Sequence, residues 1–188
     1  MKRREVVSTL LWGIGGAIIS PGVLLSACNS KPAKKESFTS DDIALLDEVG
    51  ETIIPATASS PGAKAAKIGE FMKVYVTDCY NKDHQDIFYK GLTNLRELSN
   101  KKFRKDFVDL SAAQKHALIL TLNKEANDHD RNKDRNAPEH YFSMIKEMTL
   151  FGFFTSKPGA TKTLRYLPVP GYYNGNLAYK TGDKAWAM

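Results

Sequence analysis

Apolar residues in this chain recur every three or four positions, and this spacing constrains the fold more than any other feature of the sequence. Five segments carry it, at about residues 39–54, 65–80, 83–99, 111–122 and 138–151. Such spacing places apolar side chains on one face of an α-helix, whereas a half-buried strand needs them at alternate positions. We see no strand pattern that would build a sheet. The sequence therefore predicts an all-α fold, a small bundle of about five helices.

Several residues mark where these helices begin and end. Thr39 and Ser111 are each followed, three positions later, by an acidic or amide residue, which is the pattern of an N-terminal capping box. Pro55 predicts the end of the first helix, because the residue before a proline is pushed out of the helical region. Pro138 predicts the start of the fifth, since proline is favoured at the first helical position.

The residues from 157 to 188 have a different composition. Glycine and proline recur there and exclude a long helix, so we expect an extended Pro/Gly/aromatic C-terminal tail. Two interpretations of its aromatic residues remain open: they cover the helix bundle, or they contact a partner protein. The aromatic residues of this tail are Tyr166, Tyr172, Tyr173, Tyr179 and Trp186.

The N-terminal segment has the features of an export signal. Arg3 and Arg4 precede an apolar stretch, which ends in the sequence Leu-Ser-Ala-Cys at Cys28. A charged start, an apolar middle and small residues before a cleavage point are typical of a secretory signal, and the final four residues resemble a bacterial lipobox. We therefore expect a signal peptide over residues 1–27, lipidation of Cys28, a lipidated tether over 28–37 and a helical domain over 38–188.

The route of export has more than one interpretation. The arginine pair and the glycines that dilute the apolar stretch favour a twin-arginine signal, which exports cargo already folded. Val6 stands where such signals prefer an aromatic residue, so an ordinary basic lipoprotein signal is the alternative. An uncleaved membrane helix is a third interpretation, because about 20 residues suffice to span a bilayer.

Residues that might carry chemistry are few. Residues 128–139 resemble a calcium loop, but Lys133 occupies the turn position that needs glycine, so we interpret the segment as a solvated linker. The four histidines lack the spacing of a helical zinc pair and are expected at the surface. Cys79 lies in an apolar helical segment and is expected to be a buried free thiol. The sequence thus predicts no catalytic, cofactor-binding or metal-binding residues in this chain.

The net charge of +6 is mild for a nucleic-acid-binding protein. Basic residues alternate with acidic ones, as in the cluster 101–106, which is typical of a solvated helix end. We therefore expect no nucleic-acid partner.

Several short segments together resemble one protein family. Residues 51–55, 61–66 and 70–71, followed by 150–156 and 166–172, have the order and spacing seen in the small subunit of bacterial gluconate 2-dehydrogenase, the subunit 3 family. The resemblance covers about residues 38–173. The lipobox of this chain departs from the family's plain exported form. It implies that the protein is attached to the membrane through lipid.

This resemblance implies an accessory role in an oxidoreductase complex. The family's complexes contain a large FAD-dependent subunit of the glucose-methanol-choline type, often with a c-type cytochrome that carries haem. The resemblance implies that both cofactors lie in partner subunits, and that this chain assists export, assembly and membrane tethering of the flavoprotein. The expected location is the periplasmic side of the bacterial cell envelope. The alternative is an independent periplasmic lipoprotein that serves as a binding module.

The segments of the resemblance also suggest where a partner would bind. The Glu51 carboxylate could pair with Lys64 or with an arginine of the partner, and sequence alone leaves both open. The candidate partner contacts are Glu51, Pro55, Phe153, Phe154, Pro168, Pro170, Tyr172 and Tyr173.

Overall fold

The computed structural model describes residues 37–169, 171, 172 and 174–187. The expectations for Arg3, Arg4, Cys28, Pro170 and Tyr173 therefore lie outside the described residues. Residues 35–188 form one compact unit, and all of its buried apolar core lies between Leu45 and Phe153. This unit therefore holds its own core and can fold without residues 1–34.

The described part is an all-α bundle, as the sequence predicts. Within it, the only extended pairing is an isolated bridge between Arg165 and Trp186. None of the helices in this part is both long and apolar enough to cross a bilayer. The α-helices are α3 (Ser40–Ile53), α4 (Ile68–Cys79), α5 (Lys82–Phe103), α6 (Ala112–Asn132) and α7 (Tyr141–Thr155), joined by the short helical turns η1 (Ala63–Ala66), η2 (Phe107–Asp109) and η3 (Gly159–Thr163).

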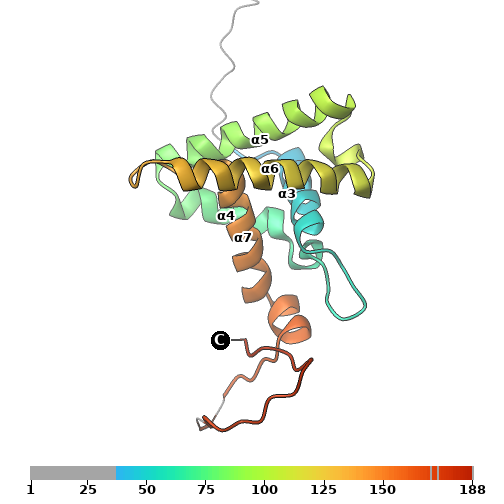
Figure 1. Cartoon of the computed structure of the whole chain (residues 1–188), viewed down its shortest axis with the longest axis vertical. Helices are drawn as coiled ribbons and strands as arrows, with labels where there is room; N and C mark the ends of the chain where they lie inside the picture. Colours follow the sequence, from blue (N-terminus) through green and yellow to red (C-terminus); the bar gives the residue numbers. More distant parts are fainter. Residues whose placement is uncertain (1–36, 170, 173, 188) are drawn as a thin grey trace, which may run out of the picture. The chain divides into compact units, whose positions relative to one another are not determined.

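Helix α7 is the centre of the bundle. It packs against α3, α4, α5 and α6, and then leads through η3 into the C-terminal tail (Figure 1). Its high apolar content fits this position, because a helix that contacts neighbours on several sides needs apolar residues around most of its circumference. The fully buried side chains at the centre include Phe88, Phe107, Phe142, Phe153, Leu92 and Leu122.

Both predicted capping boxes are confirmed. The Thr39 and Ser111 hydroxyls accept the backbone N–H groups of Asp42 and Gln114, whose side chains accept the backbone N–H groups of the caps in return. The predicted end of the first helix is also correct, since α3 stops at Ile53 and Ile54, with φ of −124° and ψ of 85°, has left the helical region before Pro55.

Four predicted helix boundaries are wrong. Helix α5 runs to Phe103, whereas the prediction ended it near residue 99. The second helix begins at Ile68 rather than near residue 65, because Lys67 adopts a left-handed conformation with φ of 53°. Helix α6 continues to Asn132 and so includes Asp128 and Asp130, which we expected in a solvated linker. Helix α7 begins at Tyr141 instead of Pro138, because the His140 side chain caps it.

A buried ion pair holds the start of α3 against α5. The Asp42 side chain is fully buried, and one of its oxygens lies 2.8 Å from Nη1 of Arg96. The other oxygen accepts the backbone N–H and the hydroxyl of Thr39, each at 2.8 Å. One carboxylate therefore caps its own helix and joins it to a helix that begins 40 residues later in the chain.

Replacing this carboxylate should destabilise the domain strongly. Asp42→Ala removes the cap and the partner of Arg96, whose side chain is 29% exposed and can be partly solvated, so we expect a loss of about 2–4 kcal/mol in the free energy of unfolding. Asp41→Ala is the matched control, because Asp41 is exposed in the same helical turn and should cost about 1 kcal/mol or less. Urea unfolding of both variants measures the difference; equal losses would contradict the role of Asp42.

Candidate functional site

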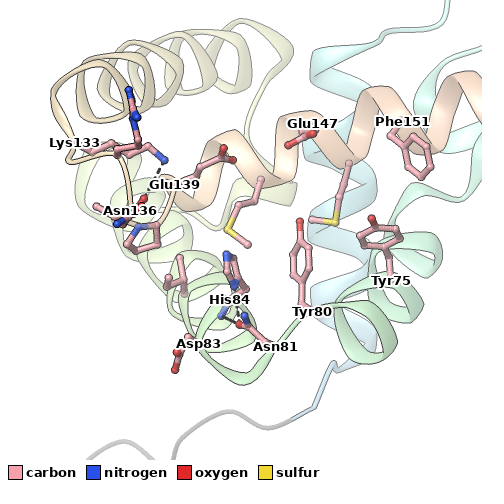
Figure 2. Close-up of a pocket in the computed structure, with 16 residues that line it drawn as sticks. Tyr75, Tyr80, Asn81, Asp83, His84, Lys133, Asn136, Glu139, Glu147 and Phe151 are labelled. Atoms are coloured by element: carbon pink, nitrogen blue, oxygen red, sulfur yellow. Dashed lines mark hydrogen bonds between the residues drawn. The ribbon is translucent and has the colours of Figure 1, made fainter.

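A cleft with a volume of about 910 Å³ opens where α4, α5 and α7 meet the segment between α6 and α7 (Figure 2). We call it the aromatic cleft. It is lined by Tyr75, Tyr80, Asn81, Asp83, His84, Ile87, Lys133, Arg135, Asn136, Ala137, Pro138, Glu139, Met144, Glu147, Met148 and Phe151.

One wall of the cleft is a set of aromatic rings in contact. The Tyr75 ring lies 5.6 Å from that of Tyr80 and 6.0 Å from that of Phe151, both in edge-to-face arrangements. Behind them, Phe71 lies 5.7 Å from Tyr75 and 5.9 Å from Phe151. Phe151 remains 51% exposed, so this wall presents apolar surface that the fold itself leaves uncovered.

The junction of α4 and α5 fixes the position of this wall. The Gln85 amide donates to the backbone carbonyls of Val76, Thr77 and Tyr80 at 3.0–3.2 Å, which satisfies the otherwise free carbonyls at the end of α4. Asn81 caps α5 by accepting the backbone N–H of His84. These bonds hold Tyr80 and His84 at the mouth of the cleft.

The opposite rim is charged. Lys133 donates from Nζ to the carbonyl of Ala137, which folds the segment between α6 and α7 over the cleft. Figure 2 shows Glu139 and Glu147 on the α7 side of the opening and Lys133 beyond them. Burial raises the pKa of Tyr80 to about 12, and the carboxylate of Glu147 adds to this effect, so the phenol remains a neutral hydrogen-bond donor.

The aromatic cleft suits binding of a segment of another protein that offers both apolar and polar groups. Aromatic and methionine side chains provide apolar contact area that adapts in shape, while the rim provides donors and acceptors that fix orientation. A helix or loop of another protein has this mixture of groups.

A second hollow of about 510 Å³ shares Pro138 and Glu139 with the aromatic cleft and contains both His129 and His140. Asp130 organises it by accepting the backbone N–H of His140 at 2.9 Å and the Ser143 hydroxyl. Burial alone would raise the pKa of Asp130, but these bonds together with His129 hold it at about 2. This carboxylate fastens the end of α6 to the start of α7.

The structure accounts for Glu51 within the chain. Its carboxylate accepts the backbone N–H groups of Ala56 at 2.9 Å and Lys64 at 3.0 Å, and so closes the loop between α3 and η1. Gly62 packs against this carboxylate so closely that a Cβ atom would lie 2.2 Å from it. The Lys64 side chain pairs with Glu48 instead. The Glu51 carboxylate therefore bonds to the backbone of Lys64, which is neither the ion pair with the Lys64 side chain nor the pair with a partner arginine that the sequence left open.

The predicted contact residues come together in part. The Ser60 hydroxyl lies 2.7 Å from that of Thr163, which joins the loop after Pro55 to the base of the tail. Phe153 is fully buried and belongs to the core, so its prediction as an accessible contact is wrong. The neighbouring Phe154 is 39% exposed, and Pro55, Pro168 and Tyr172 are exposed as well.

One other expectation is wrong, and one alternative lacks support. Cys79 is exposed rather than buried, at the last residue of α4. The described residues contain no group of three or more His, Cys, Asp or Glu side chains placed to hold a metal ion, so the calcium-loop alternative is not supported. Asp130 instead bonds to the start of α7.

The comparisons with known proteins give one match. The sequence model of gluconate 2-dehydrogenase subunit 3 matches residues 40–171, which is more than half of the chain. The chain belongs to the gluconate 2-dehydrogenase subunit 3 family. No curated protein and no solved structure matches it. Membership of the subunit 3 family agrees with an accessory subunit of a dehydrogenase complex, and the matched residues include all those that line the aromatic cleft.

The sequence did not identify the aromatic cleft of this subunit 3 protein. Tyr75 and Phe151 fall within the predicted helices 65–80 and 138–151, but helical spacing cannot show that Tyr75 is only partly buried or that Phe151 is 51% exposed. Tyr80 is the residue from which the cleft could have been suspected. It directly follows the end of a helix, and an aromatic residue there is placed where two helices meet.

The His140 cap should make stability depend on pH. The backbone N–H of Phe142 donates to Nδ1 of His140, which can accept only while that nitrogen is unprotonated. Burial lowers the pKa of His140 below 6.5, and the nearby His129 lowers it further, although Glu125 and Asp130 oppose this. Between the lowered pKa of His140 and pH 6.5, the unfolded chain therefore binds more protons than the folded chain. The free energy of unfolding should fall as the pH drops through this range.

His140→Asn tests this dependence, because asparagine caps helices well and does not titrate. We expect the difference in unfolding free energy between pH 7 and pH 5 to shrink in this variant. His116→Asn, at an exposed position of α6, should keep the full difference. An unchanged difference in His140→Asn would contradict the prediction.

Proposed function

We propose that this chain is a non-catalytic accessory subunit that binds an FAD-containing dehydrogenase subunit and assists its export, assembly and membrane tethering. The observation that carries the proposal is the family match over residues 40–171. FAD and c-type haem belong to partner subunits in this proposal, and this chain binds neither.

The aromatic cleft is the proposed docking site for the flavoprotein. It combines an exposed aromatic wall with a charged rim, which is the composition of a protein interface with a central anchor. Phe151 and Phe154 extend the apolar surface along one helix, which suits a partner segment lying against α7. The loop closed by Glu51 and its neighbour Pro55 are further candidate contacts.

The N-terminal signal gives this subunit a role in export. A flavin inserted in the cytoplasm requires a folded protein, and the twin-arginine route carries folded cargo. A subunit that bears Arg3 and Arg4 and binds the flavoprotein before export would carry it across the membrane. Lipid on Cys28 would then hold the complex on the periplasmic side of the cell envelope, since two or more acyl chains anchor stably.

Docking can be tested by recovery of the flavoprotein with this subunit from native membranes in mild detergent, read by flavin absorbance. Phe151→Ser removes an exposed anchor and should reduce recovery by about tenfold, which is typical of an interface hot spot. Leu120→Ser is the matched control, because Leu120 is 56% exposed on α6 and does not line the cleft. A colourless protein recovered alone in the unsubstituted form would instead favour an independent lipoprotein.

The export role can be tested by Arg3→Lys/Arg4→Lys, which keeps the positive charge but removes the arginine pair. We expect the flavoprotein to accumulate in the cytoplasm, because a general secretory signal tolerates lysine whereas a twin-arginine signal does not. Lys34→Arg/Lys35→Arg, the reverse exchange in the tether, also keeps the charge and should leave export normal. Normal flavoprotein export by the Arg3/Arg4 variant would rule out this route. Cell fractionation with flavin detection provides the readout.

A further inference from the structure

The C-terminal tail is a loop whose two ends are joined. The Arg165 N–H donates to the Ala185 carbonyl at 2.8 Å, and the Ala187 N–H donates to the Arg165 carbonyl at 2.9 Å. The Arg165 guanidinium also lies over the Trp186 ring, 4.6 Å from its centroid. We call the described residues between 166 and 186 the C-terminal loop; Figure 1 shows it beyond the end of α7.

This loop exposes large apolar side chains that nothing in the described fold covers. Tyr172 is 81% exposed, Val169 is 78% exposed and Tyr179 is 75% exposed. Leu167, Leu177 and Trp186 are each about half exposed. Long loops without regular structure are functional segments or linkers, and exposed apolar patches mark surfaces that contact proteins or membranes.

The charge of this region differs from that of the bundle. Residues 37–156 carry 18 acidic and 16 basic side chains, whereas residues 157–187 carry five basic side chains and one acidic one. The single acidic residue is Asp183, and its carboxylate lies 3.9 Å from the Arg165 guanidinium. The positive charge of Arg165 partly offsets the negative charge of Asp183. The loop and its base therefore present positive charge next to exposed aromatic rings.

We propose that the C-terminal loop binds the surface of a bilayer that contains anionic lipids. Tyrosine and tryptophan concentrate at the level of lipid headgroups, where their rings are apolar and their polar atoms remain hydrated. Four of the five basic residues are lysines, which anionic lipids attract but which are depleted in protein–protein interfaces. The pairing of lysine with aromatic residues thus favours a lipid surface over a protein partner for Tyr172 and its neighbours.

The proposal is separate from the docking function. It concerns the tail rather than the aromatic cleft, and it does not depend on lipid at Cys28. If both attachments form, the loop fixes which side of the domain faces the membrane.

The unit 35–188, which holds its own core, allows a direct test. Trp186 is its only tryptophan, so intrinsic fluorescence reports on the loop itself. Vesicles of phosphatidylcholine with one part in three of phosphatidylglycerol should shift the emission to the blue, and raising the salt to 1 M should reverse binding, because the Debye length falls to about 3 Å. Phosphatidylcholine alone should give little binding. No shift with the anionic vesicles at low salt would overturn the proposal.

Matched variants distinguish vesicle binding through the C-terminal loop from attraction by the net charge of the whole protein. Lys162→Glu/Lys180→Glu should reduce the vesicle partition coefficient by about tenfold or more, since each lysine near an anionic surface contributes severalfold. Lys101→Glu/Lys105→Glu makes the same change in charge at two other exposed positions. Lys101 lies in the last turn of α5 and Lys105 just after it, and this variant should reduce the partition coefficient much less. Equal reductions would mean that net charge, not the loop, drives binding. Tyr172→Ser/Tyr179→Ser should also weaken binding while leaving Trp186 as the probe.

The same variants distinguish a protein partner. If Tyr172→Ser/Tyr179→Ser abolishes recovery of the flavoprotein and leaves vesicle binding unchanged, the loop is a protein-docking surface and the membrane proposal is wrong. If it weakens vesicle binding while recovery through the cleft persists, the membrane proposal holds. Circular dichroism of each variant confirms that the bundle is folded in either case.

Discussion

The buried carboxylate of Asp42 joins α3 to α5, two helices that otherwise make little contact with each other. It accepts the backbone N–H of Thr39 at the start of α3 and binds Arg96 on α5 at the same time. A buried charge with these partners tolerates few alternative geometries, because any shift that breaks one bond leaves the charge without a compensating partner. The start of α3 is therefore held at one position against α5, while its packing on α4, α6 and α7 fixes the rest of the helix.

Local chemistry explains how much of the fold the sequence could predict. Capping boxes and Pro55 act within a few residues, so the ends of α3 and the start of α6 could be read directly. The failures have more than one cause. The continuation of α6 through Asp130 accompanies bonds from that carboxylate to His140 and Ser143, at least ten residues away, which the spacing of apolar residues cannot show. The left-handed conformation of Lys67 and the capping of Phe142 by His140 are local, but lysine and histidine are not among the residues that usually mark such positions.

The candidate site could be predicted only in outline. The family resemblance is confirmed by the match over residues 40–171. The export signal and the partner contacts at Phe154 and Tyr172 stay predictions, although both of these side chains are exposed. The aromatic cleft could not be predicted, since it needs rings from α4 and α7 to meet across a gap of about 75 residues in sequence. Phe153 and Phe154 show the same limit: adjacent aromatic residues have opposite environments, and only the packing of α7 decides which is buried.

The bridge between Arg165 and Trp186 makes the C-terminal loop a replaceable part of the molecule. A segment whose two ends touch can change in length or sequence without moving the helices that carry it, because loop closure adds only a small entropy for each added residue. The family match ends at residue 171, inside this loop. Substitutions in the remainder of the loop should therefore change what the loop contacts without loss of the core, which ends at Phe153.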